Sequence, residues 1–170
     1  MVNREKTIRL ARVALSGAML YTAQVTLSFL PNIEIVTLLI VIFAKNFGKD
    51  GITACFIYVA LNAVFAGVGL WWATYLVVWP LFALMAYKLR NIDSWLIWAV
   101  INGCFGLCFG ALFALPYAVV SPAYAFSYWI GGISYDIVHC IGNFLAALLL
   151  GKPIDAALKR IIKHKKSPDF

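Results

Sequence analysis

Charged residues are scarce in this chain of 170 residues. Aspartate, glutamate, lysine and arginine together make up 12% of it, and only seven residues are acidic. Soluble domains carry about a quarter of their residues as charged side chains. Hydrophobic residues account for 64% of the chain, more apolar surface than so small a domain can bury. This composition excludes a soluble enzyme, a nucleic-acid-binding domain and a disordered protein.

Motifs for chemistry are missing as well. The sequence has no glycine-rich phosphate loop followed by Lys-Ser/Thr, so we do not expect this chain to hydrolyse ATP. It has neither a metalloprotease helix motif nor a nucleophile elbow. The four cysteines lie in apolar stretches without metal or redox spacing, and we interpret them as packing residues. We expect no catalytic residue, no metal ion and no cofactor.

The apolar residues fall into stretches suited to membrane-spanning helices, which need about 20 residues each. We predict an all-α integral membrane protein with a single domain over residues 1–170. It comprises a cytoplasmic N-terminus (1–8), a compact bundle of six transmembrane helices (9–150) and a cytoplasmic amphipathic tail (151–170). The predicted spans are residues 9–30, 35–47, 52–66, 70–87, 95–115 and 125–150.

Glycine and proline set the expected boundaries between these spans. Residues 51–87 are uncharged and too long for one crossing, and Gly67-Val68-Gly69 is the natural break within them. Residues 116–122 are expected to form a loop between two prolines. Gly151-Lys152-Pro153 is expected to end the sixth span. A basic amphipathic segment over 154–166 should then lie on anionic lipid.

The cations test this count of spans. With six crossings, all 14 lysines and arginines lie on the side of both termini, and the opposite side carries only Glu34. Positive residues favour the cytoplasmic side, so both termini are predicted to be cytoplasmic. The second segment is short: residues 35–47 reach about 20 Å, against a hydrocarbon core of about 30 Å. We expect it to be tilted, buried or locally thinning the bilayer.

Ionisable groups at membrane depth are costly and indicate function by default. Asp136 and His139 are three residues apart and share one helix face near the midplane. They could form the polar floor of a ligand pocket or a proton-linked pair. Alternatively, they satisfy each other and also bond Asn102 or Asn62. Glu34 could contact a ligand at the outer mouth, or it could cap the short second helix.

Aromatic residues gather toward the outer side. Trp71, Tyr75 and Trp79 follow helical spacing and form one stripe, with Trp72 beside them. Tyr124 and Tyr128 lie near the last outer loop. These rings could form an interfacial belt, or some of them could stack on a planar ligand. In the first span, Ala14 and Ala18 make a flat face that another helix can approach closely, either within the bundle or from a partner subunit.

Several motifs carry a family resemblance. They are the pair Ala14 and Ala18, the segment LPNIEIVT at 30–37, FGK at 47–49, GLWW at 69–72 and GISYDIVHCIGN at 132–143. Together they resemble the substrate-binding S-component of an energy-coupling factor (ECF) transporter, over almost the whole chain. The resemblance implies a six-helix protein in the plasma membrane of a bacterium that captures a vitamin from outside. Its partners would be a transmembrane coupling subunit, which docks at Ala14 and Ala18, and two ATPase subunits.

The resemblance implies a vitamin as the ligand, and the sequence leaves its identity open. No lysine or arginine lies on the predicted outer side, which counts against folate, biotin and pantothenate. The broad aromatic set favours cobalamin or a related corrinoid, with pyridoxine or a thiamin-type ring as the alternative. The expected ligand-contacting residues are Glu34, Asn62, Trp71, Trp72, Tyr75, Trp79, Tyr124, Tyr128, Asp136 and His139.

Two other classes of protein stay open. A structural subunit of another membrane complex would bind no small molecule and would tolerate loss of Trp72 and Asp136. A small membrane enzyme, such as a lipid-modifying one, would lose turnover on Asp136→Asn.

Overall fold

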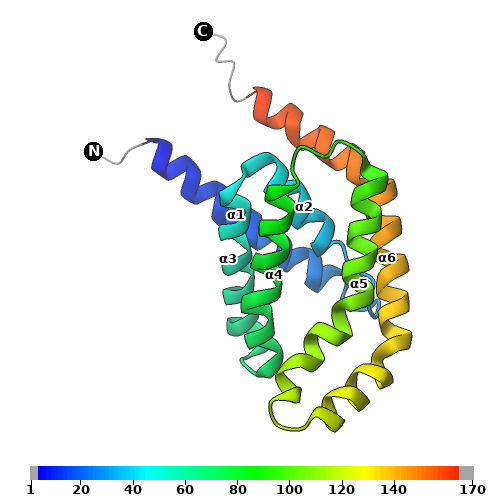
Figure 1. Cartoon of the computed structure of the whole chain (residues 1–170). Helices are drawn as coiled ribbons and strands as arrows, with labels where there is room; N and C mark the ends of the chain where they lie inside the picture. Colours follow the sequence, from blue (N-terminus) through cyan, green and yellow to red (C-terminus); the bar gives the residue numbers. More distant parts are fainter. Residues whose placement is uncertain (1–3, 165–170) are drawn as a thin grey trace.

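The computed structural model describes residues 4–164, and within them it contains six helices and no strand (Figure 1). The all-α fold expected from the sequence is confirmed. The helices are α1 (Arg4–Leu27), α2 (Val36–Phe47), α3 (Lys49–Ala66), α4 (Leu70–Lys88), α5 (Trp95–Ala118) and α6 (Pro122–His164). Residues 1–3 and the end of the predicted amphipathic tail, including Lys165 and Lys166, lie outside the described residues.

Four of these helices, α3, α4, α5 and α6, are long and apolar enough to cross a membrane. The first half of α1 is rich in charge, and α2 is short. Many large hydrophobic side chains lie exposed on the outside of the bundle, among them Phe29, Val64 and Leu149. A surface of this kind is consistent with a membrane protein, in which lipid covers these side chains.

The helix α2 forms the centre of the bundle. All nine residues from Val36 to Ala44 are buried, and α2 packs against α1, α3, α4 and α6. A helix that is apolar on every face is stable only when neighbours cover it all round. Burial is therefore the way in which the fold accommodates the short second segment.

Glycines make the two tight connections around α3. Gly67 has a φ of +83° at the end of α3, and α4 starts at Leu70, as predicted. The connection between the second and third predicted spans, residues 48–51, is shorter than expected, because only Gly48, with a φ of +61°, separates α2 from α3. These positive φ values favour glycine, since an L side chain is strained there.

The pair α5 and α6 packs closely along most of its length. Glycines of α5 bring the backbones together: a methyl group at Gly106 would lie 2.8 Å from the carbonyl of His139. The buried face of α6 has helical spacing and carries small or polar side chains. Its members are Asp136, His139, Asn143, Ala147, Gly151 and Asp155.

The prediction that Gly151 and Pro153 end the sixth helix is wrong, because α6 continues to His164. Long-range contacts hold the segment after the proline. Asp155 Oδ1 accepts a hydrogen bond of 2.6 Å from Asn46 Nδ2 of α2, and Ile154 and Leu158 pack against the core. The helix changes direction near this end in Figure 1, as expected where proline removes a backbone donor.

The loop expected over residues 116–122 is also shorter than predicted. Helix α5 runs through Pro116 to Ala118, and α6 starts at Pro122, so only residues 119–121 connect them. Pro122 occupies the first helical position, where a missing N–H is harmless. Ser121 Oγ accepts a hydrogen bond of 3.2 Å from Tyr124 N and caps the helix.

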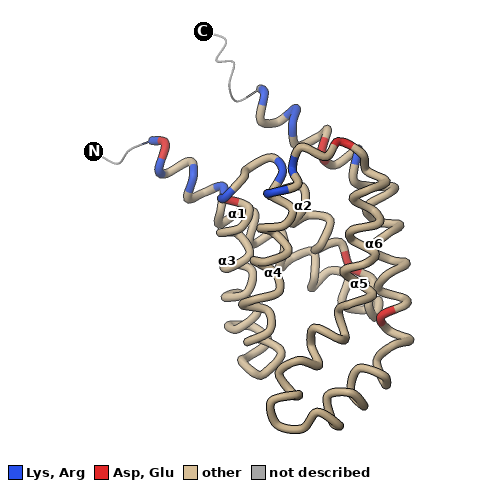
Figure 2. Tube along the Cα trace, viewed as in Figure 1, with Lys and Arg blue, Asp and Glu red and all other residues tan. Residues whose placement is uncertain are grey.

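All described lysines and arginines gather at one end of the bundle, where α1 begins and α6 ends (Figure 2). In the described residues the opposite end carries none. Arg9 Nε and Arg12 Nη1 lie 2.7 and 3.1 Å from the two carboxylate oxygens of Asp50 and tie α1 to α3 at the charged end. The described cations are thus separated from the opposite end of the bundle in three dimensions, as the prediction of six crossings requires.

Candidate ligand-binding site

A cavity of about 240 Å³ lies beneath the connection between α1 and α2. One wall comes from the end of α1 and residues 28–34. The other comes from middle turns of α3, α4, α5 and α6. The side chains that determine its chemistry are Gln24, Glu34, Tyr58, Tyr75, Trp79, Phe109 and His139.

Glu34 both caps a helix and lines this cavity. Its Oε2 accepts a hydrogen bond of 3.0 Å from Thr37 N, and its Oε1 accepts one of 2.7 Å from Thr37 Oγ1. These bonds satisfy a free N–H at the start of α2. Glu34 Oε1 also lies 3.5 Å from His139 Nε2, which is an ion-pair distance when the imidazole is protonated. Glu34 can therefore both cap α2 and contact a bound molecule, which are the two roles that the sequence left open.

Four aromatic rings form one side of the cavity, those of Tyr58, Tyr75, Trp79 and Phe109. Trp71, Tyr75 and Trp79 stack edge to face along α4, with centroid separations of 5.2 and 5.5 Å, as their spacing predicts. Of these three, Tyr75 and Trp79 line the cavity. Tyr58 contacts both of them, and Phe109 contacts the His139 ring at 4.8 Å. Such a wall suits the face of a planar ring.

Two polar side chains in the wall make no hydrogen bond within the described part of the chain. They are Trp79, through Nε1, and His139, through both ring nitrogens. Trp79 is 2% exposed and His139 is 4% exposed. A buried polar group without a partner costs roughly 1–3 kcal/mol, and such groups in native proteins call for an explanation. Beside the Glu34 carboxylate, they give the cavity donors and acceptors for a bound molecule.

Asp136 lies one turn before His139 but outside the cavity. Its Oδ1 accepts a hydrogen bond of 2.9 Å from the backbone N–H of Gly110 on α5. Gly110 follows Phe109, so this contact fixes α5 against α6 next to two cavity residues. The other carboxylate oxygen, Oδ2, is buried and has no partner in the described residues. Asp136 therefore joins α5 to α6 and does not line the cavity.

The asparagines that the sequence offered as partners for Asp136 bond elsewhere. Asn62 Nδ2 donates to Tyr58 O at 3.0 Å, and Asn102 Nδ2 donates to Trp98 O at 2.7 Å. Each amide thus bonds to a carbonyl one turn back on its own helix. The satisfied cluster of Asp136 with Asn102 or Asn62 is not formed.

Of the expected ligand-contacting residues, Glu34, Tyr75, Trp79 and His139 line the cavity, and six do not. Trp72 packs against the core and donates from Nε1 to Val59 O at 2.9 Å. Tyr124 and Tyr128 are exposed and cluster with Tyr117 near the turn between α5 and α6. The six outside the cavity are Asn62, Trp71, Trp72, Tyr124, Tyr128 and Asp136.

Of the seven side chains that determine the chemistry of the cavity, the sequence did not predict Gln24, Tyr58 and Phe109. Gln24 Oε1 accepts a hydrogen bond from the hydroxyl of Tyr58, so α1 and α3 meet at the cavity. Gln24 is an uncharged polar residue within a predicted span and could have been singled out for that reason. Phe109 gave no signal, because phenylalanine is ordinary in an apolar helix.

The small residues of α1 point in two directions. Gly17 is buried against α3, where a methyl group would lie 2.5 Å from Ile57 Cβ. Ala14 and Ala18 are exposed, with Leu15 and Met19 exposed beside them. The predicted docking pair is therefore on the open side of α1.

Within residues 4–164, no group of three or more histidine, cysteine or acidic side chains is placed to hold a metal ion. Comparison of the chain with protein-family models, with curated proteins and with solved structures finds no match.

Proposed function

We propose that this chain is a membrane-embedded binding protein that captures a small ring-shaped ligand in the cavity beneath residues 28–34. In this proposal it is the S-component of an ECF-type importer. One observation carries the proposal: Trp79 and His139 are buried in the wall of this cavity with unused hydrogen-bonding groups, beside the carboxylate of Glu34. Specific ligand sites in proteins have this form, apolar walls with a few polar groups.

The size of the cavity favours a small ligand. Sites for drug-sized molecules range from about 300 to 1,000 Å³, and this cavity has about 240 Å³. A corrinoid with its side chains is several times larger than such a space. The volume therefore favours the alternative that we drew from the sequence, a pyridoxine-like or thiamin-type ring, over cobalamin.

The charge of the lining side chains further restricts the chemical class of the ligand. No lysine or arginine among the described residues lines the cavity, and Glu34 supplies a carboxylate. A ligand carboxylate or phosphate would lack a cationic partner there, whereas a cationic ring or a hydroxyl donor would find an acceptor. In the binding mode that we infer, the ring lies against Tyr75 and Trp79, an acceptor meets Trp79 Nε1, and a donor faces Glu34 and His139.

The rest of the bundle suits a subunit that works with partners. The gathering of cations at one end supports six crossings of the plasma membrane with both termini in the cytoplasm. The exposed pair Ala14 and Ala18 offers a flat surface to a transmembrane coupling subunit. Two ATPase subunits would supply the energy, since this sequence has no phosphate-binding loop.

Thermal unfolding of the purified protein in detergent tests ligand binding. Pyridoxine or thiamin should raise the unfolding midpoint, and cyanocobalamin should not. Trp79→Phe keeps a ring but removes the N–H, so the affinity for the stabilising ligand should fall about tenfold. Trp129→Phe is the control, since Trp129 lies outside the cavity. If neither pyridoxine nor thiamin stabilises the protein, or if both variants bind equally well, the cavity is not the site.

Co-purification tests the assignment to an importer. Ala14→Trp combined with Ala18→Trp should abolish co-purification with a coupling subunit and its ATPases, and ligand binding should persist. Unimpaired complex formation by this variant would contradict the assignment. A chain that binds no small molecule and still assembles with other subunits would instead be a structural subunit.

A further inference from the structure

A second cavity, of about 430 Å³, is lined by residues of the cation-rich end of the bundle and shares no lining residue with the first. Helix α2, the connection between α4 and α5, the start of α5 and the last part of α6 all contribute to it. The lining residues that carry charge or a ring are Lys45, Asp93, Trp95, Lys152, Asp155 and Lys159. The proposed function does not use this second cavity.

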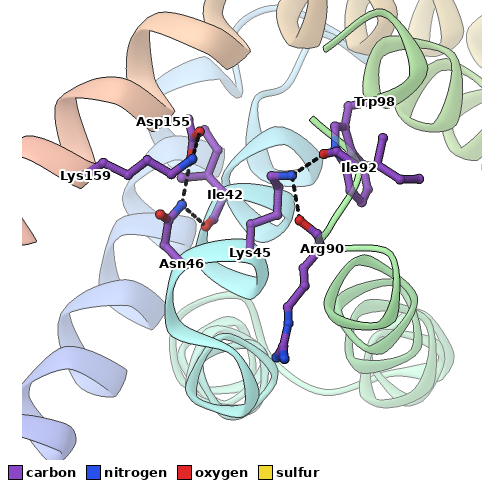
Figure 3. Close-up of polar contacts among 8 residues, drawn as sticks. All are labelled: Ile42, Lys45, Asn46, Arg90, Ile92, Trp98, Asp155 and Lys159. Carbon is purple, nitrogen blue, oxygen red and sulfur yellow. Dashed lines mark hydrogen bonds and ion pairs between the residues drawn. The ribbon is translucent and has the colours of Figure 1, made fainter. Parts of the chain in front are cut away.

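Lys45 brings to this cavity a positive charge that makes no direct ion pair in the described residues. Its Nζ donates hydrogen bonds to the carbonyls of Arg90 and Ile92 in the connection between α4 and α5 (Figure 3). It also lies 5.1 Å from the centroid of the Trp98 ring. An ammonium group has three N–H donors, so one remains. Carbonyl dipoles and a ring stabilise the charge but do not cancel it, and no carboxylate in residues 4–164 forms an ion pair with Lys45.

Asp155 makes its own hydrogen bonds and ion pair with residues other than Lys45. It accepts hydrogen bonds of 2.6 Å from Asn46 Nδ2 and 2.7 Å from Lys159 Nζ (Figure 3). Asp155 pairs directly with Lys159. The lining as a whole carries three lysines, Lys45, Lys152 and Lys159, against the two carboxylates of Asp93 and Asp155. The positive N-terminal end of α5 also begins here, at Trp95. The balance favours an anion.

The surroundings of the cavity indicate what kind of anion it takes. Exposed leucines lie close in sequence to lining residues: Leu96 follows Trp95 on α5 and is 58% exposed, and Leu149 lies one turn before Lys152 on α6 and is 66% exposed. Trp95 lies directly against Gly151 of α6, so these two helix surfaces adjoin at the cavity. A charged pocket with apolar helix surface running away from it matches a lipid, with its headgroup in the pocket and its acyl chains on the helices.

We infer that this cavity binds the phosphate of an acidic phospholipid of the cytoplasmic leaflet, with Lys45 and Lys152 as its cationic contacts. The bound lipid connects α2, α5 and α6 at the end where Pro153 interrupts the backbone hydrogen bonds of α6. This inference rests on the proposed placement of the chain in the membrane. It does not depend on which molecule occupies the first cavity.

Native mass spectrometry of the full chain released from mixed-lipid micelles tests the site. The protein should retain one phosphatidylglycerol in preference to phosphatidylcholine. Lys152 is exposed, so Lys152→Gln should fold normally and weaken phosphatidylglycerol retention about fivefold, as expected for one cation at a membrane surface. Lys163→Gln is the matched control, an exposed lysine of the same helix outside the cavity, and it should retain lipid as the wild type does.

Two further arms separate the possible outcomes. Inorganic phosphate and glycerol phosphate should not displace the lipid, because they lack acyl chains. Displacement by either would identify a site for soluble phosphate and overturn the lipid assignment. Equal retention of both lipids, or equal losses in Lys152→Gln and Lys163→Gln, would also overturn it. Thermal shifts with pyridoxine and thiamin on the same samples report on the first cavity, so the two proposals can fail independently.

Discussion

A single methyl group added at Gly110 should loosen the wall of the ligand cavity. In Gly110→Ala, the new carbon would lie 2.8 Å from Asp136 Oδ1 and closer still to Oδ2. The carboxylate must move away, and its hydrogen bond to Gly110 N is then lost. Phe109, adjacent in sequence, and His139, one turn along α6, both line the cavity. Ligand affinity should therefore fall together with stability.

The size of the effect follows from two opposing contributions. Alanine in a helix interior is more favourable than glycine by about 0.5–1 kcal/mol. Loss of a hydrogen bond that leaves a buried polar group without its partner costs about 1–3 kcal/mol, and Asp136 is only 4% exposed, so water does not replace it. The net loss is about 1–2 kcal/mol. For a protein of this length, that corresponds to a fall of about 2–8 °C in the unfolding midpoint.

Gly131→Ala is the matched control within the same pair of helices. Gly131 lies inside α6, and a methyl group there would meet nothing within 4 Å. This variant should gain only the higher helix propensity of alanine, which should raise the unfolding midpoint by about 1–4 °C. On an Asp136→Ala background, Gly110→Ala should become stabilising too. If the two glycine variants shift the midpoint in the same direction, the contact between Gly110 and Asp136 does not hold α5 against α6.

Three other predictions concern topology, backbone strain and the charged end. In a cysteine-free background, an impermeant maleimide should label Val68→Cys in intact cells and Asn91→Cys only after permeabilisation. Gly48→Ala should cost about 1–3 kcal/mol by denaturant titration, because its φ is +61° and the added methyl would lie 3.3 Å from the Tyr87 ring. Asp50→Asn should cost less than about 1 kcal/mol, since both arginine partners are substantially exposed, and salt should reduce this loss.

Each of these predictions has an outcome that would contradict it. Labelling of Asn91→Cys in intact cells would place the connection between α4 and α5 outside the cell and contradict the predicted six crossings. Gly67→Ala is the control for Gly48→Ala, because its φ is also positive but no atom lies within 4 Å of the added methyl. If Gly67→Ala loses more stability than Gly48→Ala, contact with the ring is not the cause of the loss at Gly48. A loss for Asp50→Asn that is independent of salt would show that the arginine pairs are not its cause.

Local features of the sequence predicted most of the helix boundaries. Gly67 and Gly69 interrupt an uncharged stretch, and the structure turns there, since glycine tolerates the φ that ends α3. The spacing of Trp71, Tyr75 and Trp79 put their rings in contact, because residues three and four apart meet on a helix face.

Contacts between distant residues decided the features that could not be predicted. Pro153 does not end α6, because Asp155 bonds to Asn46, 109 residues earlier in the chain. The partner of Asp136 is the backbone N–H of Gly110, and a backbone group carries no residue-specific signal in a sequence. No local pattern shows which turn of one helix faces which turn of another.

For the same reason, the sequence predicted only some of the residues of the candidate site. Polar residues within apolar segments pointed to Glu34 and His139, which do line the cavity. Tyr58 and Phe109 were missed, because their positions depend on how α3 and α5 face the interior. Tyr124 and Tyr128 were included for their ring type, but they lie on the exposed surface near the last turn.

The polar inward face of α6 has a consequence for biosynthesis. Alone in the bilayer, this helix would present Asp136, His139 and Asn143 to hydrocarbon, and one aspartate near a helix centre raises the free energy of insertion by about 2.5–3.5 kcal/mol. The ribosome completes α5 immediately beforehand, and α5 carries the N–H that accommodates this carboxylate. We therefore expect the translocon to release α5 and α6 as a preassembled hairpin.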